Sequence, residues 1–439
     1  MLLVVLSAYP HWRRAVTQKA RVQAPGVPFV VNRRLSAYSL TGMDPSFSSR
    51  VPERIVCNWL TEARARLEVC GTPIIDLTVS NPTQVGLDYP SALKHPFDCV
   101  DGCDYHPEAL GLGSAREAVA SYLRRHDLDV DSRRIVLTTS TSEAYGLLFK
   151  LLCDPGDEVM IPRPSYPLLE HLTRLESVVS VPYTLDLYTR WELDVAALRS
   201  RVTPRTRAVA IVNPNNPTGS FISSDEFREV SALCREHGLA LIVDEVFGFY
   251  PLTLPGRGPS VLDEDPAVLT FVLGGLSKAM GLPGLKLGWV VLTGPGAQVA
   301  TALERLDLIF DTYLSVATPV QLALGALLDH GRHVTRQIAA RVRQNHACLV
   351  RLVRNHPAVD LVPVEGGWYA VIRVPATDSE ERLALDLLER AHVLVYPGYF
   401  FDFQKEAFLV ISLLPESHLF ESAARRVLSF SSGSESAPL

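Results

Sequence analysis

The feature that most constrains the fold is a regular alternation of apolar runs with helix-like segments between residues 134 and 292. The apolar runs are nearly continuous, which is typical of strands that are buried on both faces of a sheet. Strands that alternate with helices favour an α/β fold, a mostly parallel sheet covered by helices on both faces. We expect the strands at 134–138, 158–161, 178–182, 208–212, 240–243, 268–273 and 287–292.

Capping signals mark two of the helices in this region. A Ser223-x-x-Glu226 capping box begins a helical segment at 225–237, and Gly238 ends it. A second box, Ser114-x-x-Glu117, predicts a helix that reaches about residue 125.

The segments on either side of this region predict a smaller α+β domain. They contain expected helices at 52–67, 318–355 and 416–428 and expected strands at 74–79, 368–373, 393–395 and 409–412. We therefore expect a small domain made of residues 46–95 and 318–430 and a large domain made of residues 96–317.

The two ends of the chain differ from the rest. Residues 1–45 are basic, with no acidic residue before Asp44. Two interpretations remain open, an organelle transit peptide or an upstream extension with Met43 as the working start. We expect residues 1–45 and 431–439 to be disordered.

Charge and cysteine usage exclude several functions. The net charge of -6 and the pI near 6.1 disfavour a nucleic-acid-binding protein. The seven cysteines indicate reduced thiols in a cytoplasmic protein rather than a disulfide framework. No second cysteine or histidine pair follows Cys99 and Cys103 at zinc-site spacing, so we expect no metal. No run is long and apolar enough to predict a membrane span.

One lysine, Lys278, lies among small residues in the Gly-rich stretch 274–288. A lysine is a useful nucleophile only where its amine is held in place and can lose its proton. Alone, this stretch is better explained by a surface lysine in a flexible loop.

Three other segments favour a ligand site. In an α/β sheet, ligands bind at the carboxyl ends of the strands. The turn 213–219 offers asparagine amides there, Asp244 ends an apolar strand, and residues 140–142 lie at a strand-to-helix junction suited to an anion. A rigid turn, an ion pair and simple N-capping would explain each one separately. Together they fit one ligand, a phosphorylated pyridine ring with a phenolic oxygen and an aldehyde.

In this order the motifs resemble the class I/II aminotransferases, a family of fold-type-I pyridoxal-phosphate enzymes, over about residues 74–428. The resemblance implies that the large domain binds pyridoxal 5′-phosphate through a Schiff base with Lys278, which also moves the proton during catalysis. It implies that Asp244 pairs with the ring nitrogen, that Asn216 bonds the ring's phenolic oxygen, and that Tyr166 stacks on the ring. The residues implied to bind the phosphate are Ser140, Thr141, Ser142, Ser277 and Lys286.

Further contacts follow from the same resemblance. Tyr105 resembles the tyrosine that reaches the phosphate of a neighbouring subunit, which implies a homodimer with shared active sites. Asn81 and Trp368 are candidate substrate contacts.

The chain departs from the family pattern at four positions. Phe247 stands where many relatives have a tyrosine, Gly275 where a hydroxyl residue is common, and Lys286 where arginine is usual. Val410 stands where the family places the arginine that binds the substrate carboxylate. Either another cation, such as Lys405 or Arg373, replaces it, or the donor is not bound through an α-carboxylate.

Five of the aromatic residues that precede Val410 in the predicted small-domain segment 318–430 could line an apolar mouth. We expect most of them to belong to the core, however. They are Trp368, Tyr369, Tyr399, Phe400 and Phe401.

The sequence thus predicts an aminotransferase that moves an amino group between a small-molecule amine donor and a keto or aldehyde acceptor. A decarboxylase or lyase that uses the same cofactor is the alternative, and a non-catalytic regulator that keeps the fold is a third hypothesis.

Overall fold

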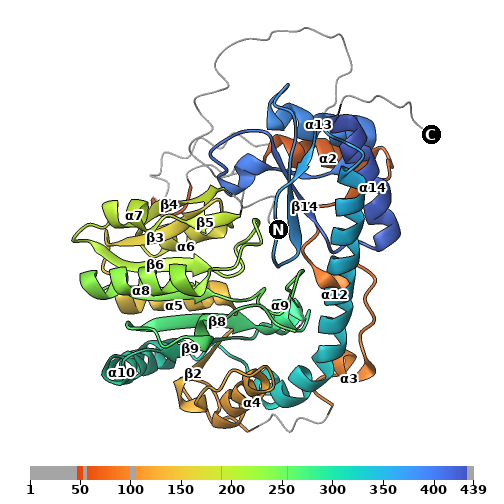
Figure 1. Ribbon diagram of the computed structural model, residues 1–439. Coiled ribbons are helices and arrows are strands. Elements are labelled where there is room, and N and C mark those ends of the chain that lie inside the picture. The colour runs from red at the N-terminus through yellow and green to blue at the C-terminus, as the bar shows by residue number, and fades with distance from the viewer. Residues whose placement is uncertain (1–46, 53–56, 99–103, 189, 255, 433–439) are drawn as a thin grey trace, which may run out of the picture.

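A computed structural model describes residues 47–52, 57–98, 104–188, 190–254 and 256–432. The expectations for residues 1–45, for Cys99 and Cys103, and for residues 433–439 of the tail lie outside these ranges. Figure 1 shows two lobes, one built on a large sheet and one on smaller sheets, with the long helix α12 (Leu324–Val353) along the side of both.

The large lobe is built on a sheet that has eight strands in the described residues, in the order β2-β9-β8-β7-β6-β3-β4-β5. The neighbours from β8 to β4 are parallel, whereas β9 and the edge strand β5 run antiparallel to their neighbours. The strands are β2 (Ile135–Thr138), β3 (Glu158–Arg163), β4 (Val179–Leu187), β5 (Trp191–Leu193), β6 (Thr206–Val212), β7 (Ala240–Asp244), β8 (Thr270–Gly275) and β9 (Gly288–Thr293). The seven expected strands are confirmed, and β5 was not predicted.

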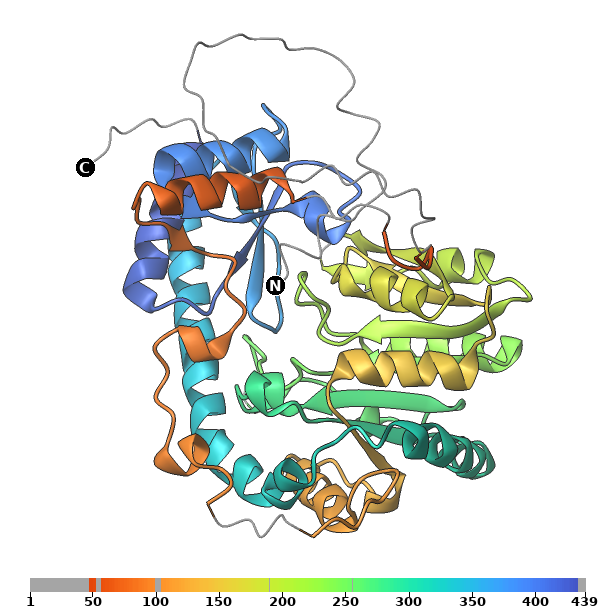
Figure 2. The same cartoon turned by 180° about the vertical axis from the view of Figure 1, so that it is seen from behind.

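Helices cover both faces of this sheet because successive strand residues point to opposite sides. In β3, Val159 and Ile161 pack in the same cluster as the helices α5 (Thr141–Leu152), α6 (Leu168–Leu175) and α10 (Gly296–Tyr313). Met160 lies in the cluster of the other face, with α4 (Gly113–Arg124), α7 (Val195–Ser200) and α8 (Ser224–His237). Figures 1 and 2 show these two layers from opposite sides.

The two predicted capping boxes have different outcomes. The box at the start of α8 is present, and Gly238 ends the helix in the left-handed conformation. The box predicted at Ser114 is wrong, because the N-cap residue of α4 is Leu112, two residues earlier, and Leu112 gives no side-chain cap. Instead, the Glu108 carboxylate accepts from the Gly113 N–H at 3.1 Å. An acceptor outside the helix therefore supplies what the box would have supplied.

The small lobe combines both ends of the described chain. Its antiparallel sheet has the order β10-β11-β14-β13, and the short strands β1 and β12 pair in parallel beside it. Its strands are β1 (Ile75–Asp76), β10 (Asp360–Leu361), β11 (Tyr369–Arg373), β12 (Val393–Leu394), β13 (Tyr396–Pro397) and β14 (Phe408–Ser412). Its helices are α2 (Trp59–Val69), α13 (Glu380–Ala391) and α14 (Ser417–Ser431).

The helical pattern predicted from residue 318 is two helices, α11 (Thr318–Leu322) and α12, separated by Ala323. Helix α12 contacts α4 and α9 (Leu276–Ala279) of the large lobe and α14 and β10 of the small lobe. Within the described ranges, no helix has the length and apolar character needed to cross a membrane. The remaining short elements are α3 (Ser91–Lys94), η3 (Pro82–Gln84), η4 (Ser132–Arg134), η5 (Val261–Asp263), η6 (Pro283–Leu285) and η7 (Gly398–Phe401).

Candidate active site

The predicted site segments meet at one edge of the large sheet. Strands β3, β6, β7 and β8 are parallel, so the residues that follow them lie at the same edge. Strand β2 runs in this direction too, because β9 is antiparallel to both β2 and β8. Figure 1 shows α9, which carries Lys278, at the end of the sheet that faces α12.

Lys278 is held in a largely apolar environment. Its Nζ lies 4.9 Å from the centre of the Trp368 ring and 5.6 Å from the centre of the Phe247 ring. Burial lowers the pKa of Lys278 to about 8, although the Asp244 carboxylate opposes the decrease. A substantial fraction of the amine is therefore neutral near physiological pH, as a nucleophile requires.

Two hydroxyl groups fix the backbone of α9. The Tyr250 hydroxyl donates to the Lys278 carbonyl oxygen at 2.5 Å, and the Thr335 hydroxyl of α12 donates to the Ala279 carbonyl oxygen at 2.6 Å. A helix of four residues has little stability of its own, so these two bonds position the lysine.

Asp244, the last residue of β7, is a carboxylate with few partners. Burial raises its pKa to about 6, against hydrogen bonds from the Val246 N–H at 3.2 Å and the Tyr145 hydroxyl at 3.5 Å. Such a carboxylate gains from a cationic partner, and the protonated nitrogen of a pyridine ring has the right chemistry.

The turn 213–219 is fixed by its neighbours, but the amide oxygens of Asn215 and Asn216 have no hydrogen-bond partner among the described residues. The Asn213 Nδ2 donates to Glu245 Oε1 at 3.0 Å, and the Asn215 Nδ2 donates to the Pro164 carbonyl oxygen at 3.0 Å. Asn216 is buried, and its amide oxygen has no hydrogen-bond partner among the described residues. A buried polar atom without a partner is unusual, so Asn216 fits a site that is completed by a ligand.

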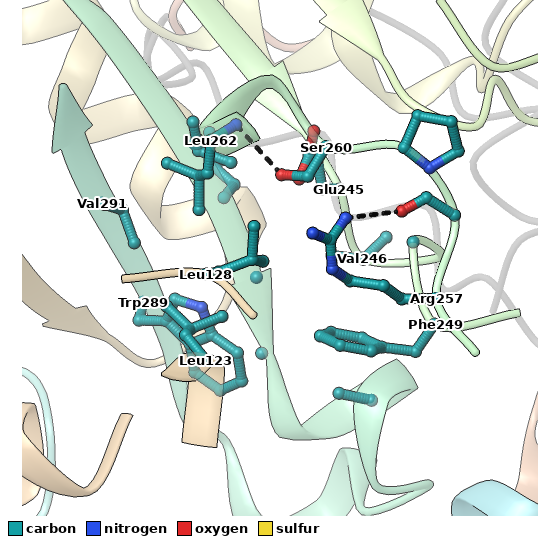
Figure 3. Close-up of a pocket in the computed structure, with 18 residues that line it drawn as sticks. Leu123, Leu128, Glu245, Val246, Phe249, Arg257, Ser260, Leu262, Trp289 and Val291 are labelled. Atoms are coloured by element: carbon teal, nitrogen blue, oxygen red, sulfur yellow. Dashed lines mark hydrogen bonds between the residues drawn. The ribbon is translucent and has the colours of Figure 1, made fainter. Parts of the chain in front are cut away.

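Glu245, the neighbour of Asp244, borders a hollow on the opposite side of β7–β9. Figure 3 shows this hollow, with Glu245 and Ser260 at one end and Trp289 and Leu123 at the other. The Glu245 carboxylate accepts from the Ser260 hydroxyl at 2.5 Å, from the Val261 N–H at 2.8 Å and from the Asn213 amide. Its hydrogen-bonding capacity is used in this way, so Glu245 serves to anchor the 213–219 turn.

Of the predicted phosphate-binding residues, Ser140, Thr141 and Ser142 lie at the start of α5, and Ser277 lies in α9. Ser140 accepts from the Glu143 N–H at 3.2 Å as the N-cap of α5, so Thr141 and Ser142 form the first turn of that helix. Thr138 and Gly275 both pair with Gly288, which brings the start of α5 close to Ser277 in α9. Lys286 is exposed. Tyr105 is 65% exposed in the single chain.

The two candidate substrate residues differ in what surrounds them. Trp368 is buried and lies over the Lys278 amine. The side-chain oxygen of Asn81 accepts from the Thr83 N–H at 3.1 Å, so it caps its own turn and only its amide nitrogen remains for a ligand. Of the five aromatic residues before Val410 that could have lined an apolar mouth, all but Tyr399 are buried in the core, as we expected.

The two cations suggested as replacements for the missing carboxylate-binding arginine are both exposed. Arg373 forms an ion pair with Asp360 at 2.6 Å, with both side chains more than half exposed. Lys405 is exposed. Sequence reasoning missed Tyr145 and Tyr250, whose only signal is that each tyrosine closely follows a predicted site segment.

Comparison with known proteins identifies the family to which this fold belongs. The profile of the family described as "Aminotransferase class I and II" matches residues 103–426. An alanine aminotransferase of Mycobacterium tuberculosis is 30% identical over 382 residues, which cover 83% of this chain and 87% of that protein. The glutamate-pyruvate aminotransferase AlaA of Escherichia coli is 28% identical, with 85% and 94% covered.

Solved structures of aminotransferases have the same fold as this chain. The crystal structure of an aminotransferase from Escherichia coli has a TM-score of 0.78 and 27% identity, and the match covers 89% of this chain and 99% of that one. An alanine aminotransferase from Pyrococcus furiosus has a TM-score of 0.77 and 26% identity, with 85% and 95% covered.

The fold and the lysine-centred site define an enzyme of the fold-type-I class, for which pyridoxal phosphate is the cofactor. The chain belongs to the class I and II aminotransferase family. It is an aminotransferase, as the sequence predicted.

Proposed function

We propose that the enzyme transfers an amino group from a small amine donor to a keto or aldehyde acceptor, with Lys278 as the covalent attachment point of pyridoxal phosphate. The observation that carries this proposal is the position of a lysine with a pKa of about 8 and the partly buried Asp244 at one sheet edge. As a neutral amine, Lys278 can also accept and return the proton that moves during transfer.

The other residues act by holding the cofactor. When bound, pyridoxal phosphate supplies a pyridinium ring that withdraws electrons from the carbon that loses a proton. Asp244 would keep the ring nitrogen protonated, the Asn216 amide would bond the phenolic oxygen, and Tyr166 would cover one face of the ring. The residues proposed to hold the phosphate are Ser140, Thr141, Ser142, Ser277 and Lys286.

We further propose a homodimer in which Tyr105 reaches the partner's site. Exposed apolar side chains on α10 and α11 support this, with Leu308 73%, Tyr313 52% and Leu322 44% exposed. Mixing the inactive variants Lys278→Ala and Tyr105→Ala tests the sharing of sites. Mixed dimers should regain activity that neither parent has, and no regain would contradict the proposal.

Residues 46–95 with 318–430, and 96–317, are the proposed domains. The free thiols of Cys57, Cys70, Cys153, Cys234 and Cys348 support a reducing compartment such as the cytoplasm. The relatives named for alanine support a donor with a short side chain.

The test uses the visible absorption of the bound cofactor. Protein saturated with pyridoxal phosphate should absorb in the visible range, and Lys278→Ala should lose this band, whereas Lys150→Ala on the exposed side of α5 should keep it. With an amine donor and no acceptor, an aminotransferase converts its cofactor once and stops. Continued turnover would identify the decarboxylase or lyase alternative.

A further inference from the structure

The last residue of β3 is an arginine at the same sheet edge as the candidate active site. Arg163 ends β3, and Asp244 ends β7 in the parallel part of the sheet. Residues two apart in a strand point to the same face, so Arg163 shares the face of Ile161, and Asp244 shares the face of Ile242. Both isoleucines belong to one core cluster. The two charged side chains therefore leave the sheet on the same side.

The strand register places Arg163 level with Asp244. Val212 of β6 pairs with Asp244, and Val209 of β6 pairs with Met160 of β3. Three residues further along both strands, the same register sets Arg163 beside Val212. Neighbouring strands are about 4.8 Å apart, so two spacings, about 10 Å, separate the backbones of Arg163 and Asp244. A long arginine side chain can therefore approach a ligand held over Asp244.

The segment that follows Arg163 joins the asparagine-containing turn to the small lobe. The Asn215 amide nitrogen donates to the Pro164 carbonyl oxygen at 3.0 Å. The Ser165 N–H donates to the Phe401 carbonyl oxygen at 3.0 Å. Arg163 thus lies where the large sheet, the turn and the small lobe meet, which is where a substrate between the lobes would be bound.

Arg163 faces the carboxylate of Asp402 in the small lobe. Its Nε lies 3.2 Å from Asp402 Oδ2. This contact lacks hydrogen-bond geometry, since the buried Nε has no hydrogen-bond partner among the described residues. Asp402 is held by its backbone in the left-handed conformation, with φ +60°, and its N–H donates to the Tyr399 carbonyl oxygen at 3.1 Å. The Arg163 Nε therefore has a charge beside it without the hydrogen bond that makes an arginine–carboxylate contact strong.

The Arg163–Asp402 ion pair is accessible, whereas Val410 is not. The side chains of Arg163 and Asp402 are 24% and 26% exposed, and Val410 is 0% exposed. Arg373 differs from Arg163, because its Nε and Nη2 donate to Asp360 at 3.2 and 2.6 Å. Arg163 therefore keeps a donor for a ligand carboxylate, and Arg373 is already engaged.

We propose that Arg163 binds the carboxylate of an amino-acid donor, in place of the arginine that the family carries at the position of Val410, and that Asp402 occupies Arg163 until the donor binds. This deepens the proposed transamination at Lys278 and rests on it. A donor carboxylate is free to turn both oxygens toward the guanidinium, which favours paired, charge-assisted hydrogen bonds. The substrates are then α-amino acids and the corresponding α-keto acids.

The two partners of the ion pair should respond in opposite directions. Enzyme loaded with pyridoxal phosphate is mixed with L-alanine, L-glutamate or L-tyrosine without an acceptor, and the visible absorption of the cofactor is followed. For the donor that reacts fastest, Arg163→Gln should raise the half-saturating concentration about tenfold or more, as the loss of a charged hydrogen bond predicts. Asp402→Asn should lower it, because this variant removes the competing charge and asparagine tolerates the left-handed conformation.

Two further variants keep the test specific. Arg163→Lys retains the charge and should recover part of the affinity, whereas Arg373→Gln removes an arginine that is already engaged and should leave the half-saturating concentration unchanged. If Arg163→Gln and Asp402→Asn weaken donor binding alike, the ion pair is structural and the inference is overturned. An Arg163→Gln variant that saturates like the wild type would overturn it as well. Wild-type enzyme that converts its cofactor with none of the three donors would refute the proposed function, and this inference with it.

Discussion

Glu245 links the stability of this enzyme to pH in a way that one substitution can isolate. Burial raises the pKa of its carboxyl group from 4.5 to about 7. The folded protein therefore binds this proton more tightly than the unfolded chain does. The stabilisation is fully present below about pH 4.5 and is lost as the pH rises through about 7. Between pH 5 and pH 8 the loss is about 2.5 kcal/mol of unfolding free energy.

The variant Glu245→Gln removes the titration and keeps the shape of the side chain. The amide oxygen can still accept from the Val261 N–H and the Asn213 amide, and the amide nitrogen can donate to the Ser260 hydroxyl oxygen. We expect the wild type to lose about 2.5 kcal/mol more than this variant between pH 5 and pH 8.

Denaturant unfolding at the two pH values measures this difference. Glu229→Gln, at an exposed position of α8, is the matched control. A Glu245→Gln variant whose unfolding free energy follows the wild type in parallel at both pH values would refute the reasoning. So would a variant that is less stable than the wild type at pH 8.

Three further predictions concern the site. Covalent attachment of pyridoxal phosphate to cofactor-free enzyme should accelerate with pH and level off above about 8, because the Lys278 amine must be neutral; stopped-flow absorbance measures this, and a pH-independent rate would contradict it. Asp244→Asn should reduce kcat about a hundredfold, since it removes one partner of a buried charge pair; steady-state kinetics at saturating cofactor test this, and an unchanged kcat would count against the pairing. Gly219→Ala should destabilise the protein by about 3 kcal/mol in thermal or denaturant unfolding, because φ is +72° and a Cβ would lie 2.2 Å from a Val364 methyl carbon; a stability equal to the wild type would contradict this reading of the turn.

Most strands of the large sheet could be predicted from the sequence because they are buried on both faces. Continuous apolar runs such as β6 and β7 then stand out without knowledge of their partners. Strand β5 did not stand out, because its three residues form an edge hairpin with β4 whose pairing depends on the rest of the sheet. The helix start predicted at Ser114 was wrong for a related reason, since the acceptor that replaced it comes from Glu108 outside the helix.

The site was predictable where its chemistry lies in short motifs and unpredictable where distant residues complete it. Lys278, Asp244 and Asn216 each follow or end a recognisable strand. Tyr145 bonds Asp244 across 99 residues of sequence, and Thr335 holds the α9 backbone across 56. Such partners leave no local pattern in the sequence, because they are selected by the packing of separate elements.

The long helix α12 has a mechanical consequence for the lysine. Thr335, near the middle of α12, bonds the residue that follows Lys278, while Asn345, further along the same helix, bonds the Leu413 and Pro415 carbonyl oxygens just after β14. One continuous helix therefore holds the backbone beside Lys278 at one point and the segment after β14 of the small lobe at another. A tilt of α12 would move both contacts together, so this helix couples the position of the lysine to that of the small lobe.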